Sequence, residues 1–242
     1  MHALSDNSTL ELNVDVFSFV ISQGMVADAD LLAEQLRGCG VPHSEFARLR
    51  VAVSQVAGPR KAVVHVTGSR LALALRPAPA ASPEITMFAE PIRDQRAQPQ
   101  RRGPDLGWQR HVIATLGTSD GLLGDAHSRI ISAVLQPMVT FPSATQAVIS
   151  GHPATTPSYA LQGVVRVLEE AGVETHQEAN GFSRFDLMHQ ETWAVDSVLG
   201  ARLVEQWKEY GTPKPGPRII ERGALPTHRG VNAIRQQRAS LL

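Results

Sequence analysis

The chain has 242 residues, of which 43% are hydrophobic and 19% are charged, a composition typical of a soluble protein with one large core or two modest ones. Its 23 basic and 23 acidic residues balance, so overall charge favours neither nucleic acid nor an anionic membrane as a partner. No apolar run reaches the roughly 20 residues that span a bilayer, and residues 1–6 lack the basic and apolar segments of a secretory signal. Cys39 is the only cysteine, so no internal disulfide is possible and a cytoplasmic location is expected.

Residues 14–76 are predicted to form a small α+β lobe. Apolar and polar side chains alternate along 14–26 and the chain bends at Gln23-Gly24, which indicates a pair of strands. Ser44 is expected to cap a helix that opens at Pro42. The other predicted elements are helices at 28–37 and 44–56 and strands at 61–66 and 70–76.

The next segment is expected to join two lobes. Residues 77–83 are rich in alanine and proline, and Glu84–Ile92 predicts one more strand at the edge of the first lobe. The polar run that follows is typical of a solvated linker. We therefore predict an N-terminal lobe over 1–92, a linker over 93–101 and a C-terminal lobe over 102–242.

The second lobe is predicted to be a larger α/β unit. A helix over 105–116 opens it, and 161–171 is a strongly amphipathic helix closed by Gly172. Strands are expected at 121–124, 129–135, 137–141, 147–150, 192–195 and 199–206, and further helices at 183–190 and 232–242.

Three stretches follow the pattern of one enzyme family. Arg102-Gly103-Pro104-Asp105-Leu106 is similar to a Lys-Gly-Pro-Asp-Leu segment, Leu161–Arg166 to a Leu-Pro-Gly-Val-Thr-Arg turn, and Glu191–Gly200 to a Glu-Thr-Trp hairpin. The chain thus resembles, over nearly its whole length, the class IV (fold-type IV) aminotransferases and 4-amino-4-deoxychorismate lyases, which use pyridoxal phosphate (PLP). The resemblance implies a two-lobed α/β fold like that of the D-amino-acid and branched-chain aminotransferases. It also implies a homodimer with a site between the lobes.

The residues that PLP chemistry needs are replaced. The resemblance implies that the imine-forming lysine matches Arg102, or Arg101 after a shift of one residue, and a guanidinium cannot form that imine. The chain has only three lysines, Lys61, Lys208 and Lys214, and none matches this position.

Two further parts of the PLP site depart in the same way. In the family a glutamate pairs with the pyridine nitrogen of the cofactor, and this chain has Ser132 at the matching position. The phosphate turn matches Gly163-Val164-Val165, which keeps the backbone amides of a helix N-terminus and loses the threonine hydroxyl. The family's early His and Arg fall near Leu32 and Gln35. We therefore expect no PLP cofactor.

A polar cavity around Arg102 remains as the candidate site, because a guanidinium can hold a carboxylate through two hydrogen bonds. The candidate catalytic residues are Arg102, Ser132 and Asp196. The candidate substrate-binding residues are Gln136, Thr140, His152, Thr155, Ser158, Gly163, Val164, Val165, Arg166 and Ser197. No histidine spacing indicates a metal site. The expected ligand is a small anionic metabolite.

Three functions stay open. The first is a PLP-independent lyase, hydrolase or cyclase that acts on a small carboxylated metabolite. The second is a non-catalytic ligand-binding or partner subunit, and the third is a conventional PLP-dependent aminotransferase or aminodeoxychorismate lyase in another register. A defined polar pocket would favour the first function. A collapsed pocket filled by Arg102 and apolar side chains would favour the second.

Overall fold

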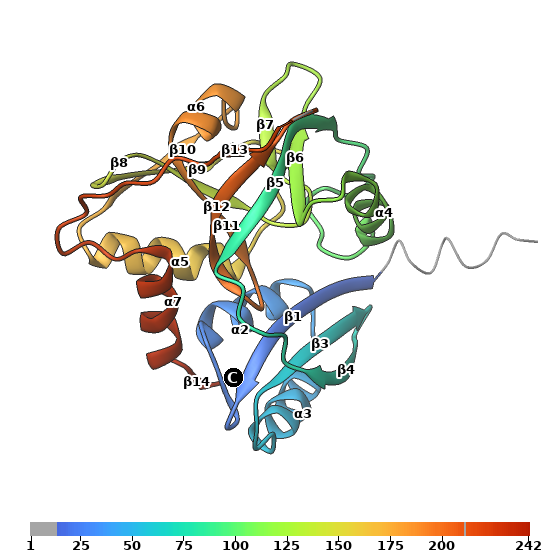
Figure 1. The fold of residues 1–242 in the computed structure, drawn as a ribbon. Coiled ribbons are helices and arrows are strands. Elements are labelled where there is room, and N and C mark those ends of the chain that lie inside the picture. Colours follow the sequence, from blue (N-terminus) through green and yellow to red (C-terminus); the bar gives the residue numbers. More distant parts are fainter. Residues whose placement is uncertain (1–13, 211) are drawn as a thin grey trace, which may run out of the picture.

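The computed structural model describes residues 14–210 and 212–242. The residues inspected above for a secretory signal lie outside this part of the chain. The described chain forms two lobes, each built on one β-sheet (Figure 1).

Two helices cover one face of the smaller lobe's sheet. Its elements are β1 (Val14–Ser22), β2 (Met25–Val26), α2 (Ala29–Gly38), α3 (His43–Ser54), β3 (Arg60–Thr67), β4 (Arg70–Pro77) and the late strand β14 (Ser240–Leu241). The strand order is β14-β2-β1-β3-β4. Phe17, Phe19 and Ile21 alternate along β1 and are buried in the core with Leu32 and Leu36 of α2.

The larger sheet has nine strands, of which eight follow the order β10-β9-β8-β11-β12-β5-β6-β7, while β13 pairs with β12. Their bounds are β5 (Glu84–Arg93), β6 (Asp120–Gly124), β7 (Ile130–Ala133), β8 (Met138–Ser143), β9 (Gln146–Ser150), β10 (Glu174–Glu178), β11 (Glu191–Asp196), β12 (Gly200–Lys208) and β13 (Lys214–Pro215).

Strand β5 corrects the sequence-based assignment. It was expected at the edge of the smaller lobe, but it runs parallel to both β12 and β6 inside the larger sheet. Met87, Phe88 and Ala89 are all buried, so both faces of the strand are covered, as is typical of a central parallel strand. The chain therefore passes from the smaller sheet to the larger one between β4 and β5. The proposed linker at 93–101 stays a prediction.

Four helices accompany the larger sheet: α4 (Leu106–Leu116), α5 (Tyr159–Glu170), α6 (Arg184–His189) and α7 (His228–Gln237). In Figure 1, α5 and α7 lie on the side of the larger sheet that faces the smaller lobe. The terminal helix was expected over 232–242, but α7 begins and ends four or more residues earlier, and the chain then adds β14 to the smaller sheet.

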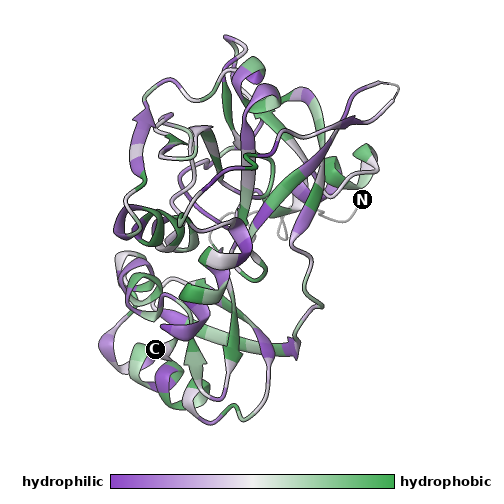
Figure 2. Cartoon of the chain, turned by 60° about the vertical axis from the view of Figure 1, so that its left-hand side comes forward, coloured by the Kyte–Doolittle hydropathy of each residue, from purple (hydrophilic) through white to green (hydrophobic). Residues whose placement is uncertain are grey.

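One hydrophobic core runs through both lobes. Phe19 and Leu32 of the smaller lobe belong to the same buried cluster as Leu168, Trp193 and Leu203 of the larger one. Two further clusters lie within the larger lobe, one around Met87 and Trp207 and one beneath α4. Figure 2 shows hydrophobic stretches along the strands of both lobes. The lobes are therefore packed against each other rather than merely tethered.

Candidate functional site

The loop that carries Arg102 is fixed against the first strand of the smaller lobe. The Val16 amide donates to the Arg102 carbonyl oxygen at 2.6 Å, and Arg101 forms a two-point ion pair with Asp15, with its Nε 2.9 Å from Oδ1. At Gly103 the backbone φ is 153°, and a Cβ there would lie 2.0 Å from the Val14 carbonyl oxygen, so only glycine fits this approach. The contacts place Arg102 between the lobes.

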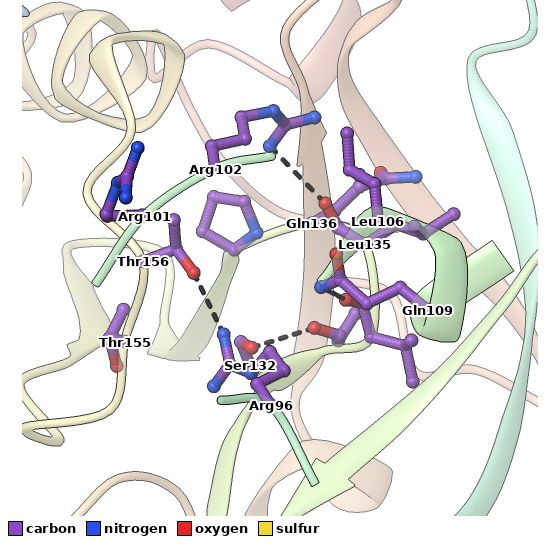
Figure 3. Close-up of a pocket in the computed structure, with 13 residues that line it drawn as sticks. Arg96, Arg101, Arg102, Leu106, Gln109, Ser132, Leu135, Gln136, Thr155 and Thr156 are labelled. Carbon is purple, nitrogen blue, oxygen red and sulfur yellow. Dashed lines mark hydrogen bonds between the residues drawn. The ribbon is translucent and has the colours of Figure 1, made fainter. Parts of the chain in front are cut away.

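A small polar cavity of about 20 Å³ lies beside Arg102 (Figure 3). The Arg102 Nη1 approaches the Leu135 carbonyl oxygen at 3.5 Å, and the Ser132 hydroxyl donates to the Ala133 carbonyl oxygen at 2.7 Å. The amide oxygen of Gln136 is buried and has no hydrogen-bond partner within the described chain. A water molecule needs about 10–15 Å³ of such space, so the cavity has the size of about one water molecule.

Three arginines line this cavity, and two of them are neutralised. Arg96 forms a two-point pair with Asp94 and also donates to Thr156, and Arg101 is paired with Asp15. No carboxylate of the described residues pairs with Arg102, whose side chain is half-buried. Arg102 therefore keeps most of its five donors for a ligand.

Arg101 and Arg102 also line a wider, open cleft of about 400 Å³. Asp15, Gln35 and Cys39 also line it. Burial, followed by the charge of Asp15, raises the pKa of the Cys39 thiol above its ordinary value, so the thiol stays protonated and is a poor nucleophile. Arg102 thus lines both a water-sized cavity and a cleft large enough for a small metabolite.

The expected phosphate turn is absent from the N-terminus of α5. Helix α5 already begins at Tyr159, so Gly163 is inside the helix. The Leu161 amide donates to the Ser158 hydroxyl at 3.2 Å and the Tyr159 amide to the Gln35 side chain at 3.1 Å. These side chains satisfy donors that would otherwise be free for an anion. The expectation that Gly163-Val164-Val165 present helix-terminal amides is therefore wrong.

The remaining predicted site residues are distributed over the larger lobe. Arg166 pairs with Asp30 at 2.6 Å, and Thr140 is buried against Thr192. His152 faces Asp125 with 3.5 Å between Nε2 and Oδ2. The Asp196 carboxylate accepts the amides of Val198 and Leu199, the Ser197 carbonyl accepts the Tyr159 hydroxyl, and Ser158 caps α5. Around the small cavity the structure brings together Arg102, Ser132, Gln136 and Thr155.

Sequence reasoning missed Asp120, a fully buried carboxyl at the start of β6. It accepts the Gly121 amide at 2.8 Å and the Leu135 amide at 3.2 Å, and so supports the loop whose carbonyl approaches Arg102. Burial raises the pKa of Asp120 to about 7. In the sequence, Asp120 is a single acidic residue just before the apolar pair Leu122-Leu123, and this pattern could have indicated a buried carboxyl.

Neither a metal centre nor a membrane span is present in the described part of the chain. None of its His, Cys, Asp and Glu side chains form a group of three or more that could hold a metal ion. None of its helices is both long and apolar enough to cross a bilayer.

No family model and no curated protein matches the sequence, but solved structures do. A hypothetical aminotransferase from Mycobacterium tuberculosis, with α-ketoglutarate and PMP bound, is similar with a TM-score of 0.71 at 13% identity, over 91% of this chain and 88% of that one. The 4-amino-4-deoxychorismate lyase from Pseudomonas aeruginosa gives 0.66 at 15% identity, over 90% and 91%. The Escherichia coli branched-chain amino acid aminotransferase gives 0.61 at 11% identity, over 80% and 76%. The chain therefore has the two-lobed α/β fold of the fold-type IV aminotransferases and aminodeoxychorismate lyases.

Proposed function

We propose that this protein binds a small carboxylated metabolite at Arg102 and does so without pyridoxal phosphate. The observation that carries the proposal is the half-buried Arg102 guanidinium, which has no carboxylate partner although the two neighbouring arginines each have one. A charge held partly out of water without a partner is unfavourable. A carboxylate ligand in the adjoining cleft would supply that partner through two parallel hydrogen bonds.

The residues present do not fit PLP. None of the chain's lysines lines the small cavity or the cleft, so no amine is placed to form an imine with an aldehyde. The Ser132 hydroxyl is engaged by a backbone carbonyl, and no acidic side chain of the described residues lines the small cavity to protonate a pyridine nitrogen. The Tyr159 and Leu161 amides in the first turn of α5 are also engaged by side chains.

The same geometry favours binding over catalysis. Within the described chain, the small cavity is lined by no histidine, carboxylate, lysine or cysteine that could move a proton near pH 7. In the cleft, Asp15 is held by Arg101, and the Cys39 thiol has a raised pKa. The small cavity and the cleft thus offer charged and polar groups that can bind a ligand, and no described side chain placed to transfer a proton.

The proposal is tested by screening carboxylated metabolites, chorismate-like acids and amino acids first, for a rise in Tm and then by calorimetry with the best binder. A hydrogen bond to a charged group contributes about 1.5–3 kcal/mol, so Arg102→Ala is expected to weaken binding roughly ten- to a hundredfold. Arg93→Ala removes the same charge from an exposed position that lines neither cavity and should leave the affinity unchanged. Equal affinities of the wild type and Arg102→Ala would refute the proposal.

The cofactor claim has a separate test. Protein incubated with PLP should show no imine absorption, and borohydride should trap no adduct that mass spectrometry can find on any lysine. Arg102→Lys alone should not restore transamination, because Ser132 leaves the pyridine nitrogen without an acid. A trapped adduct would overturn this part of the proposal. Conversion of the bound metabolite without PLP would establish instead the lyase, hydrolase or cyclase that the sequence left open.

A further inference from the structure

A groove of about 310 Å³ separates the smaller sheet from the start of α4. Its floor is formed by Val14, Val16 and Val63. Val16 alternates along β1 with Phe17 and Phe19, which face the buried core with α2 and α3, so the groove lies on the face of the sheet turned away from these helices. The groove shares Leu106 with the small cavity, but residues 132–137 and Arg102, which line that cavity, do not line the groove.

Basic side chains from three elements surround the groove. Lys61 and His65 come from β3, Arg76 from β4 and Arg110 from α4. No carboxylate of the described residues lines the groove or pairs with any of these four side chains. The groove is therefore lined by four basic side chains with no described acidic partner.

The sheet register makes the charge arrangement unfavourable by itself. Lys61 of β3 stands directly opposite Arg76 of β4 in the antiparallel pair. Side chains at such positions lie on the same face, with Cβ atoms about 4.5–5.5 Å apart, and like charges there destabilise the sheet. An anion that bridges the two side chains would remove this repulsion.

We propose that this groove binds an organic anion that carries at least two negative charges and an apolar body. The apolar body would lie on the valine floor, and the negative groups would meet Lys61 with Arg76 on one side and Arg110 on the other. A second copy of the chain is a poor occupant, because a two-fold contact brings the same basic patch against itself. The site does not depend on the proposed ligand of Arg102, since Arg102 does not line the groove.

The test uses bis-ANS, a fluorescent probe with two sulfonates and a large aromatic body, titrated into the full-length protein. Arg76→Gln is expected to weaken its binding at least about tenfold, because each charge-assisted hydrogen bond is worth that factor or more. Arg70→Gln removes the same charge from the other end of β4, outside the groove, and should bind the probe like the wild type. Arg102→Gln should do so as well, which separates this site from that of Arg102.

A second variant, Arg76→Glu, distinguishes loss of the site from poor folding of Arg76→Gln. It places a carboxylate opposite Lys61 and should raise Tm while it abolishes probe binding, because the new cross-strand pair is favourable. Ultraviolet irradiation of bound bis-ANS followed by peptide mapping should label the peptides of β3 and β4. Unchanged binding by Arg76→Gln and Arg76→Glu, or labelling confined to other peptides, would overturn the proposal.

Discussion

Replacement of Asp120 by asparagine should change how the stability of this protein depends on pH. Asp120 is completely buried, its carboxylate accepts the amides of Gly121 and Leu135, and Asp196 adds a nearby negative charge that also disfavours ionisation. The pKa of the carboxyl rises from 3.8 to about 7 on folding. Arg202, which is buried nearby on β12, is the opposing positive charge.

The sign and size of the effect follow from proton linkage. Between pH 3.8 and about pH 7 the native state holds this proton and the unfolded state does not, so the free energy of unfolding falls as pH rises. Each pKa unit corresponds to about 1.4 kcal/mol, and the interval from 3.8 to about 7 thus corresponds to a loss of about 4 kcal/mol. The stabilisation is complete below the unfolded-state pKa and lost above the folded-state pKa.

Urea denaturation followed by tryptophan fluorescence at several pH values between about 4 and 8 measures this. The stability of the wild type relative to Asp120→Asn is expected to fall by about 4 kcal/mol across the range. Leu122→Ala, at a fully buried neighbouring position, should lower the stability by about 2–5 kcal/mol at every pH. A wild-type-minus-Asp120→Asn difference that is constant with pH would refute the reasoning.

Further predictions concern the packing between the lobes. The buried pair between Arg235 and Asp28, with 2.6 Å between nitrogen and oxygen, joins the two lobes, and Arg235→Ala should lower the free energy of unfolding by about 3–5 kcal/mol in urea. In Gly163→Ala the new methyl would lie 2.3 Å from the Asp28 carboxylate, so its Tm should fall, while Gly38→Ala, with nothing within 4 Å, should not lose stability. Ser158→Ala removes the cap of α5 and should cost about 1 kcal/mol. Light scattering is expected to give a homodimer, and a monomer at micromolar concentration would contradict that expectation.

Local sequence patterns predicted most of the helices and strands, and the elements that were predicted wrongly or missed have physical explanations. β5 was placed at an edge although Met87, Phe88 and Ala89 form a continuous apolar run, which is the pattern of a strand covered on both faces. The edge strand β10 was missed because its sequence Glu-Thr-His-Gln-Glu has no apolar alternation. Ser44 does not cap α3, because the helix already begins at His43 after Pro42.

The candidate site was predicted less well than the fold. The position of Arg102 in the loop before α4 could be inferred, since Gly103-Pro104 marks that loop. The prediction of a turn at Gly163 was wrong because α5 begins earlier, at Tyr159. Ser158 caps this helix, and a serine before Tyr159-Ala160 is a sequence pattern that indicates such a start. Which arginines are neutralised depends on contacts between distant segments, such as Arg101 with Asp15, and no local pattern contains that information.

The return of the chain to the smaller sheet has a consequence for how the protein is made. β14 pairs with β2, and Leu242 is buried in the core that Phe17 and Leu32 share. The smaller lobe therefore lacks a strand and part of its core until residue 242 has left the ribosome, although its other strands emerge first. During synthesis the free edge of β2 is open to pairing with other chains until β14 covers it.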